Sequence, residues 1–253
     1  MTKASQNCHI QIPTSILKKF SFPTTNNEGQ KIHAVYSLKM NGDIVVENIK
    51  DVNIQYAYYH EEIENLLCKI ETDFGELKKK IIKDSGVCIL NKREVETIDL
   101  FFKNAMARSP LFCEESRTKL SLSDGDVQDL LVANVNLKEF DLDKTRYCIV
   151  KNKTTRNFIL PQMCCFCIQV GDKILMFMPI TEKIGIGLYK TEDEKEFASF
   201  FELQKQEEII KINRLAVAHE AIMNKQSIFA KDHKELSAYV PLLKDIIDNN
   251  IQV

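Results

Sequence analysis

Residues 31–49 read KIHAVYSLKMNGDIVVENI, and this stretch decides the first part of the fold. Two runs of strand-forming residues, Lys31–Lys39 and Asp43–Ile49, flank a turn that contains Asn41-Gly42. Asn-Gly between alternating apolar runs is the strongest short-range signal for a β-hairpin, because both residues tolerate the positive φ that the turn needs. The stretch therefore predicts a two-stranded antiparallel hairpin.

The segment before this hairpin predicts a short helix. Pro13 is followed by Ile16, Leu17 and Phe20, whose spacing places them on one side of a helix. Proline suits the first helical position, since its φ is already fixed near the helical value. We expect a helix from Pro13 to Phe20.

Beyond the hairpin, apolar residues recur every three or four positions, which is typical of amphipathic helices. The first stripe starts after Glu61 and comprises Ile63, Leu66, Leu67, Ile70, Phe74, Leu77 and Ile81. A second helix begins at Asn91, where Glu94 completes a capping-box pattern, and ends at Ser109-Pro110. Two long helices are therefore expected in this part of the chain.

The second half of the chain returns to strand-like runs. Phe158–Leu160 is one such run, and Cys164–Val170 and Lys173–Ile180 flank Gly171-Asp172, a turn signal that predicts a second hairpin. Ile184–Leu188 is expected to add a short edge strand.

A third long helical region is expected from Thr191 to about Asn224, because Thr191 and Glu194 have capping-box spacing. One face of this region carries Phe197, Phe200 and Phe201. A strand at Ser227–Ala230 and a helix at Pro241–Ile247 complete the chain.

Two hairpins separated by a helical block predict an α+β fold, with antiparallel strands packed against three long helices. We expect one domain over residues 1–253. Its expected parts are the N-terminal hairpin 31–50, the helical block 61–140, the second hairpin 157–188 and the C-terminal helices 191–250. The block includes a weak helix at Val127–Val135.

Composition narrows the class of protein. The 253 residues are 44% hydrophobic, which is enough for a full core. A formal charge of −2 argues against a surface that is basic throughout, as nucleic-acid or membrane binding over the whole molecule would require, although a local basic groove is compatible with it. No apolar leader precedes Ile12, and every apolar run is far shorter than the roughly 20 residues of a membrane helix. We expect a cytoplasmic protein with reduced thiols and no membrane contact.

The cysteine cluster Cys164-Cys165-Phe166-Cys167 is the most conspicuous chemical motif. A structural zinc site needs a second Cys or His pair, and none follows, so we favour a buried core role and predict no metal site. His60 with Glu61 and Glu62 is read mainly as the acidic start of a helix. The sequence identifies no cofactor.

A basic cluster is the main candidate for phosphate contact. It surrounds Tyr147 and comprises Lys144, Arg146, Lys151, Lys153 and Arg156. Five cations in one stretch are suited to RNA or DNA phosphates, and a solvated face is the alternative. The acidic run Glu192–Glu208 is either another solvated face or a docking site for a basic partner.

A series of loose motifs covers roughly Cys8 to Tyr239 in a fixed order. The motifs are Ile10–Pro13, Leu17–Phe20, Tyr58-Tyr59 with Glu62, Glu64 and Glu71, Phe102 with Arg108-Ser109-Pro110, Asn157–Leu160, Met178–Ile180 with Ile184, Asn213 with Ala216, and Ile228–Ala230. This order resembles a widespread bacterial and phage family catalogued as domain of unknown function 4238.

The chain departs from the family pattern at two places. His9 lies four residues before Pro13, whereas the family places a histidine three residues before it. Pro161-Gln162 stands where relatives carry a Ser-Asp or Thr-Asp pair, so a carboxylate is missing. If that pair does chemistry in relatives, this member is inactive or altered; if it caps a strand end, little is lost.

The resemblance implies four candidate site residues: Tyr59, Glu64, Arg108 and Asn213. They either converge on one polar cleft with a catalytic role or pair with one another and the backbone as buried polar groups.

Three functions follow as hypotheses. The first is a component of a bacterial conflict or phage-defence system that acts through a protein partner or as a homo-oligomer. The second is a nuclease-like, nucleic-acid-processing enzyme that uses Glu64, Arg108 and Asn213 beside the basic cluster. The third is a small-ligand sensor with a pocket between the second hairpin and the helices.

Overall fold

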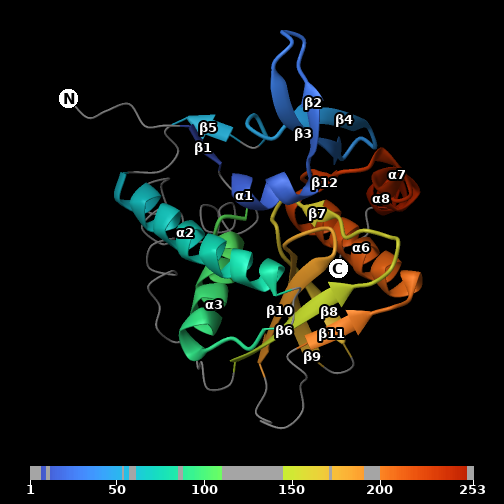
Figure 1. Ribbon diagram of the computed structural model, residues 1–253. Coiled ribbons are helices and arrows are strands. Elements are labelled where there is room, and N and C mark those ends of the chain that lie inside the picture. The colour runs from blue at the N-terminus through green and yellow to red at the C-terminus, as the bar shows by residue number, and fades with distance from the viewer. Residues whose placement is uncertain are drawn as a thin grey trace, which may run out of the picture.

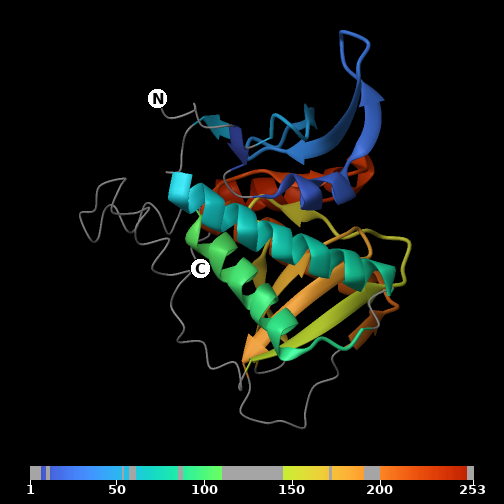
Figure 2. The ribbon, with the colours of Figure 1, turned by 60° about the vertical axis from the view of Figure 1, so that its left-hand side comes forward.

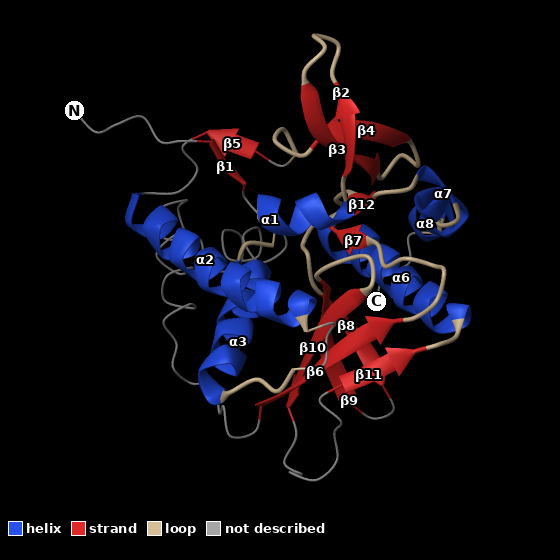
Figure 3. Cartoon of the chain, viewed as in Figure 1, coloured by secondary structure: helices blue, strands red, loops and turns tan. Residues whose placement is uncertain are grey.

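The computed structural model describes residues 7–9, 12–52, 54–56, 61–84, 88–109, 145–170, 173–190 and 200–249. Within these ranges the chain forms an α+β fold with two five-stranded sheets and several helices (Figures 1 and 3). The predicted α+β class is therefore confirmed, whereas the finer prediction of antiparallel strands on three long helices is not. The expected weak helix Val127–Val135 and the turn Gly171-Asp172 lie outside the described residues.

The first sheet is built around β3 (Lys31–Leu38). This strand pairs antiparallel with β2 (Phe22–Thr25), β4 (Ile44–Asn48) and β12 (Ile228–Ala230), and β12 also pairs with β7 (Leu160–Pro161). The hairpin predicted from residues 31–49 is thus present as β3 and β4. The positive φ of 89° at Gly42 in its turn agrees with the sequence signal.

The β2–β3 hairpin projects from the body of the molecule, as both ribbon views show (Figures 1 and 2). The pairing of β12 with β3 places residues from the two ends of the chain side by side, with Ile228 opposite Leu38.

The second sheet has the strand order β11-β6-β10-β9-β8. Its strands are β6 (Thr145–Asn152), β8 (Phe166–Val170), β9 (Lys173–Pro179), β10 (Ile184–Lys190) and β11 (Phe200–Leu203). The expected second hairpin corresponds to β8 and β9, which pair antiparallel.

Two expectations about this sheet are wrong. Strand β10 lies in the centre, between β6 and β9, rather than at an edge. Its glycines allow this position, because a Cβ at Gly185 would overlap the ring of Phe177. Strand β11 pairs parallel with β6, so the sheet is mixed rather than purely antiparallel.

The two predicted helices of the first half are α2 (Glu61–Lys83) and α3 (Lys92–Ala107). They pack against each other through the stacked rings of Phe74 and Phe101, whose centroids lie 3.9 Å apart. The capping box is present, since the Asn91 side chain accepts a hydrogen bond from the Glu94 amide and the Glu94 carboxylate accepts one from the Asn91 amide. Figure 2 shows the two helices side by side next to the second sheet.

The third long helix is shorter than expected. It is α6 (Gln206–His219), which continues as a π-helical turn over Glu220–Asn224. Phe200 and Phe201 lie in strand β11 rather than on a helix, because the parallel register with β6 decides the local structure there. Thr191, Glu194 and Phe197 lie outside the described residues.

Short elements complete the described chain. Helix α1 (Thr14–Leu17) and a 3-10 turn over Lys18–Phe20 match the predicted N-terminal helix. Strands β1 (Asn7–His9) and β5 (Ile54–Tyr56) pair antiparallel. Two further short helices, α7 (His233–Ser237) and α8 (Val240–Asp248), flank the first sheet (Figure 1). The expected set of three long helices and two hairpins is therefore too simple.

One continuous apolar core joins the sheets and helices. It includes Ile16 of α1, Phe74 of α2, Phe102 of α3, Phe177 of β9 and Phe229 of β12, all at most 1% exposed. None of the described helices is both long enough and apolar enough to cross a lipid bilayer.

Candidate ligand-binding cleft

The four residues that the family resemblance singled out do not form one group. Tyr59 lies outside the described residues. Glu64 lies on α2, where it accepts a hydrogen bond from the Cys68 thiol across 3.8 Å. Arg108 caps the C-terminal end of α3 and is buried, and its Nη1 pairs with Glu71 Oε1 of α2 at 3.1 Å.

Glu64, Cys68 and Glu71 share one side of α2 because they are spaced by four and three residues. Burial and then the two carboxylates raise the pKa of Cys68, while Arg108 lowers it. Glu64 and Arg108 therefore belong to the same cluster between α2 and α3, in which the ion pair joins the two helices.

Asn213 belongs to a different cluster, around α6. Its Nδ2 donates to the Asn157 carbonyl at 2.8 Å and to the Tyr239 hydroxyl oxygen at 3.0 Å, and its Oδ1 accepts from the Ile159 amide at 3.2 Å. The side chain is 1% exposed. Asn213 thus fixes the irregular segment 157–159, which leads into β7, to α6. This is the structural role that buried polar groups commonly have.

The basic cluster is dispersed. Lys144 lies outside the described residues. Arg146 and Lys151 occupy positions of β6 that point to opposite faces of the sheet. Lys153 pairs with Glu202 at 3.2 Å, and Arg156 pairs with Glu235 at 3.6 Å. These contacts weaken the expectation of one continuous surface for nucleic-acid phosphates.

The expected core role of the cysteine cluster is confirmed for two of its cysteines and wrong for the third. Cys164 and Cys165 are buried, whereas Cys167 is exposed. The hydrogen bond with Cys164 and then burial raise the pKa of Cys165, so its reactive thiolate form is disfavoured. Among the described residues, no group of three or more His, Cys, Asp or Glu side chains is arranged to hold a metal ion.

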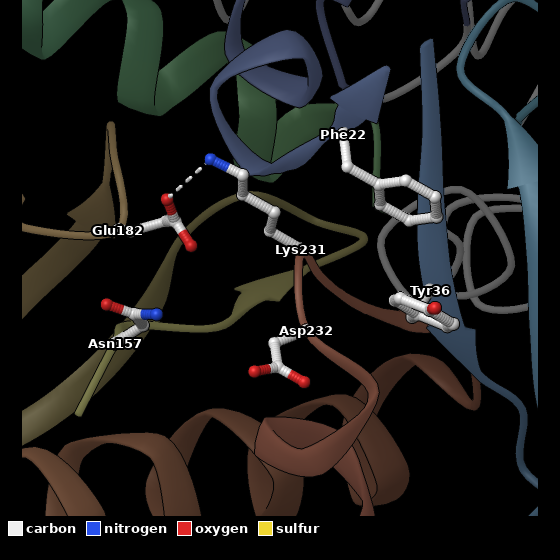
Figure 4. Close-up of a pocket in the computed structure, with 6 residues that line it drawn as sticks. All are labelled: Phe22, Tyr36, Asn157, Glu182, Lys231 and Asp232. Carbon is white, nitrogen blue, oxygen red and sulfur yellow. Dashed lines mark ion pairs between the residues drawn. The ribbon is translucent and has the colours of Figure 1, made fainter. Parts of the chain in front are cut away.

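A cleft of about 540 Å³ lies where five segments of the chain meet. Its lining combines an aromatic pair with an amide and three charged side chains (Figure 4). The six residues are Phe22 of β2, Tyr36 of β3, Asn157 after β6, Glu182 in the turn between β9 and β10, and Lys231 and Asp232 between β12 and α7.

Strand register builds the aromatic side of the cleft. Phe22 is opposite Ala34, which shares a face of β3 with Tyr36, so the two rings lie on one face of the sheet. They stack with centroids 4.8 Å apart and an interplanar angle of 26°. The rings of His233 and Tyr36 pack edge to face, with centroids 5.6 Å apart and an interplanar angle of 82°. Both rings remain partly exposed.

The register between β12 and β3 brings the charged residues of the cleft to the aromatic pair. Ala230 of β12 is opposite Tyr36, so Lys231 and Asp232 follow directly beside the ring. Lys231 Nζ pairs with Glu182 Oε2 at 3.6 Å. Asp232 caps α7, and its Oδ1 accepts a hydrogen bond from the Lys234 amide at 2.8 Å.

The backbone groups of Asn157 make the hydrogen bonds that hold this residue in place, so its side chain is available to the cleft. Its amide donates to Glu235 Oε1 at 3.3 Å, and its carbonyl accepts from Asn213. Glu235 is 8% exposed, and burial raises the pKa of its carboxyl while the nearby Arg156 lowers it. Asn213, Glu235 and Tyr239 therefore form a buried support beneath the cleft.

Sequence reasoning missed most of this cleft. Asn157 stood in one of the family motifs, but Phe22, Tyr36, Glu182, Lys231 and Asp232 were assigned no role. Asp232 before His233-Lys234-Glu235 is a helix-capping signal that would have placed α7. No sequence signal joins Asp232 to Tyr36, because only the β3–β12 register brings both residues to the same cleft.

Comparison with known proteins adds no assignment. No protein-family model matches the chain, and neither a curated protein nor a solved structure matches it. The resemblance to the family of unknown function thus stays a prediction.

Proposed function

We propose that this protein binds a small polar ligand in the cleft between the first sheet and the β12–α7 connection. The observation that carries the proposal is the composition of the cleft, in which a stacked aromatic pair faces an amide and charged groups from other segments. Its volume of about 540 Å³ falls within the range of about 300 to 1,000 Å³ that is usual for small-molecule sites. A small-ligand sensor is one of the three functions considered from the sequence, although the pocket expected there lay between the second hairpin and the helices.

Support for a nuclease-like activity is weaker. The side chains expected to act together belong to separate clusters, with Arg108 beside Glu71 and Asn213 beside Asn157 and Tyr239. Two of the basic residues expected to contact phosphates are in ion pairs with Glu202 and Glu235.

The biological role, the partner and the location of the protein remain predictions. A role in bacterial conflict or phage defence, a protein partner or homo-oligomer, and a cytoplasmic location rest on the sequence interpretation. A ligand sensor is compatible with such a role, since binding that favours one conformation shifts the population toward it.

The proposal is tested by screening a metabolite library for thermal stabilisation of the whole protein. A ligand that binds only the folded state stabilises it by about 2.7 kcal/mol at a hundred times its Kd. The variant Asn157→Ala removes the carboxamide from the cleft and keeps both backbone hydrogen bonds. Lys50→Ala, which removes an exposed cation outside the cleft lining, is the matched control.

We expect at least one ligand whose stabilisation is reduced by Asn157→Ala and retained by Lys50→Ala. A screen without a hit, or hits that respond equally to both variants, would contradict the proposal.

A further inference from the structure

We infer that the ligand of this cleft carries a guanidinium group. The inference rests on the proposed binding function and names the chemical class of the ligand. It is carried by the charge balance of the cleft, the unused hydrogen-bond acceptors of its side chains and the aromatic pair beside them.

The charge of the lining favours a cation. Lys231 is the one positive side chain among the six lining residues, and it is already paired with Glu182 at 3.6 Å. Asp232 forms no ion pair with a described residue, and its carboxylate accepts only the Lys234 amide. Asp232 is therefore the one lining carboxylate without a side-chain cation as its partner among the described residues, and its charge faces only the N-terminus of α7.

The groups around the lining do not cancel this charge. Arg156 is paired with Glu235 at 3.6 Å. The Nζ of Lys183 donates to the carbonyl oxygens of Thr154 and Arg156, each at 2.7 Å. Both cations are thus directed to partners outside the cleft lining.

The acceptors of the lining match a ligand with many donors. The Asn157 carboxamide and the Tyr36 hydroxyl form no hydrogen bond with a described residue, and Asp232 has capacity beyond its single bond. Figure 4 shows Asp232 between Asn157 and Tyr36, with the carboxamide nitrogen of Asn157 on the side of Asp232 and its oxygen on the far side. The carboxamide turns about its last bond, so either group can face a ligand. Guanidinium presents five N–H donors in one plane, whereas an ammonium presents three.

The aromatic pair supports the same group. Mutual stacking covers one face of each ring, so a guanidinium plane would stack on the other face of Phe22 or of Tyr36, within about 6 Å of the ring centroid. The attraction grows when the site is partly dry. Phe22 and Tyr36 are already ordered by their mutual stacking at 4.8 Å, so binding does not have to immobilise them.

Two sources supply this chemistry: a free small molecule and the arginine side chain of a peptide. Agmatine and arginine represent the first, and the peptide Gly-Arg-Gly represents the second. Citrulline is the matched neutral probe, since a urea group replaces the guanidinium in a molecule of nearly the same shape.

The test is a titration of the whole protein with each probe, followed by the NMR signals of the Asn157 side-chain amide and the Lys234 backbone amide. We expect agmatine, arginine or Gly-Arg-Gly to bind at least about tenfold more tightly than citrulline, because a charge-assisted hydrogen bond is lost with the charge. Tighter binding of the free molecules or of the peptide then identifies the source.

The decisive variant is Asp232→Asn, because asparagine caps a helix as well as aspartate does. It removes the charge and keeps an acceptor for the Lys234 amide, so α7 is retained. We expect agmatine to bind this variant at least about tenfold more weakly. Asp248→Asn, at the exposed end of α8, is the control and should bind agmatine like the natural protein.

Equal binding of citrulline and arginine, or an unchanged affinity in Asp232→Asn, would overturn the inference. If no guanidinium probe binds but another ligand stabilises the protein and depends on Asn157, the inference is wrong and the binding function stands. If no ligand of any class binds, both are wrong.

Discussion

Lys78 is a buried lysine whose ammonium group meets no carboxylate among the described residues. Its Nζ donates to the Ser15 carbonyl at 2.7 Å and to Ser15 Oγ at 2.9 Å, which ties α2 to α1. Burial lowers the pKa of Lys78 to about 8, with further contributions from the positive charges of Lys19 and Lys79. The folded state therefore gives up this proton more easily than the unfolded chain does.

The free energy of unfolding should consequently depend on pH through Lys78. Between pH 8 and the ordinary lysine pKa of 10.5, the unfolded chain binds more protons at this site than the folded protein, so stability rises with pH. We expect urea unfolding to show that Lys78→Met loses this contribution. The unfolding free energy of the natural protein minus that of the variant should therefore become more positive from pH 7 to pH 10.

Lys79→Met is the control, because Lys79 is 72% exposed and pairs with Glu76 on the surface. A constant difference between the natural protein and Lys78→Met across this pH range would show that the site does not titrate as proposed.

Asn213 offers a second test at the residue scale. Asn213→Ala removes three hydrogen bonds and leaves the Ile159 amide buried without its acceptor. An unsatisfied buried group costs about 1–3 kcal/mol, and we expect chemical denaturation to show a loss of at least this size. Arg214→Ala, at the exposed neighbouring position of α6, should change stability by less than about 0.5 kcal/mol. If the two substitutions lower the free energy of unfolding equally, the structural role given to Asn213 is wrong.

At the scale of single elements, glycines have opposite roles in helix α2 and strand β10. A Cβ at Gly75 of α2 would meet no atom within 4 Å, so this glycine is tolerated rather than required. A Cβ at Gly187 of β10 would lie 2.6 Å from Cys148 Sγ and 2.8 Å from a methyl carbon of Leu175. The close approach of the neighbouring side chains over β10 depends on the missing Cβ.

The two glycines form a matched pair for alanine substitution. We expect thermal denaturation to show that Gly75→Ala stabilises the protein by about 0.5–1 kcal/mol, because alanine loses less backbone entropy in a helix. Gly187→Ala should destabilise it by about 1–3 kcal/mol through overpacking. A neutral Gly187→Ala variant would mean that β10 relaxes more easily than its contacts indicate.

At the scale of the whole molecule, a strand from the C-terminal part of the chain completes the first sheet. Strand β12 lies between β3 and β7, and the apolar core runs without interruption from α1 to the second sheet. A shared core favours cooperative unfolding of both sheets. It is the physical basis for expecting the chain to behave as one domain.

Native-state hydrogen exchange tests that expectation. Strand β3 is central to the first sheet and β10 to the second, so each has partners on both sides. If both sheets open only on global unfolding, their slowest amides should give the same opening free energy. Opening free energies that differ by more than about 1 kcal/mol between β3 and β10 would show two separately unfolding units.

Local pattern by itself determined the α+β class, the hairpin at residues 31–49, the start of α3 at Asn91 and the helix α2. These features depend on residues close together in sequence, since turn dihedrals, helix caps and apolar periodicity act over a few positions. The burial of Cys164 and Cys165 also followed from residue type.

Tertiary structure alone decided the central place of β10, the parallel pairing of β11 and the separation of Arg108 from Asn213. It also decided the cleft, which Tyr36 and Asp232 both line because β12 pairs with β3 across almost two hundred residues of chain. Such contacts are selected by the burial of a common core, which no local pattern encodes. The side chains that line the cleft are therefore ordinary in sequence and become a site only in the folded molecule.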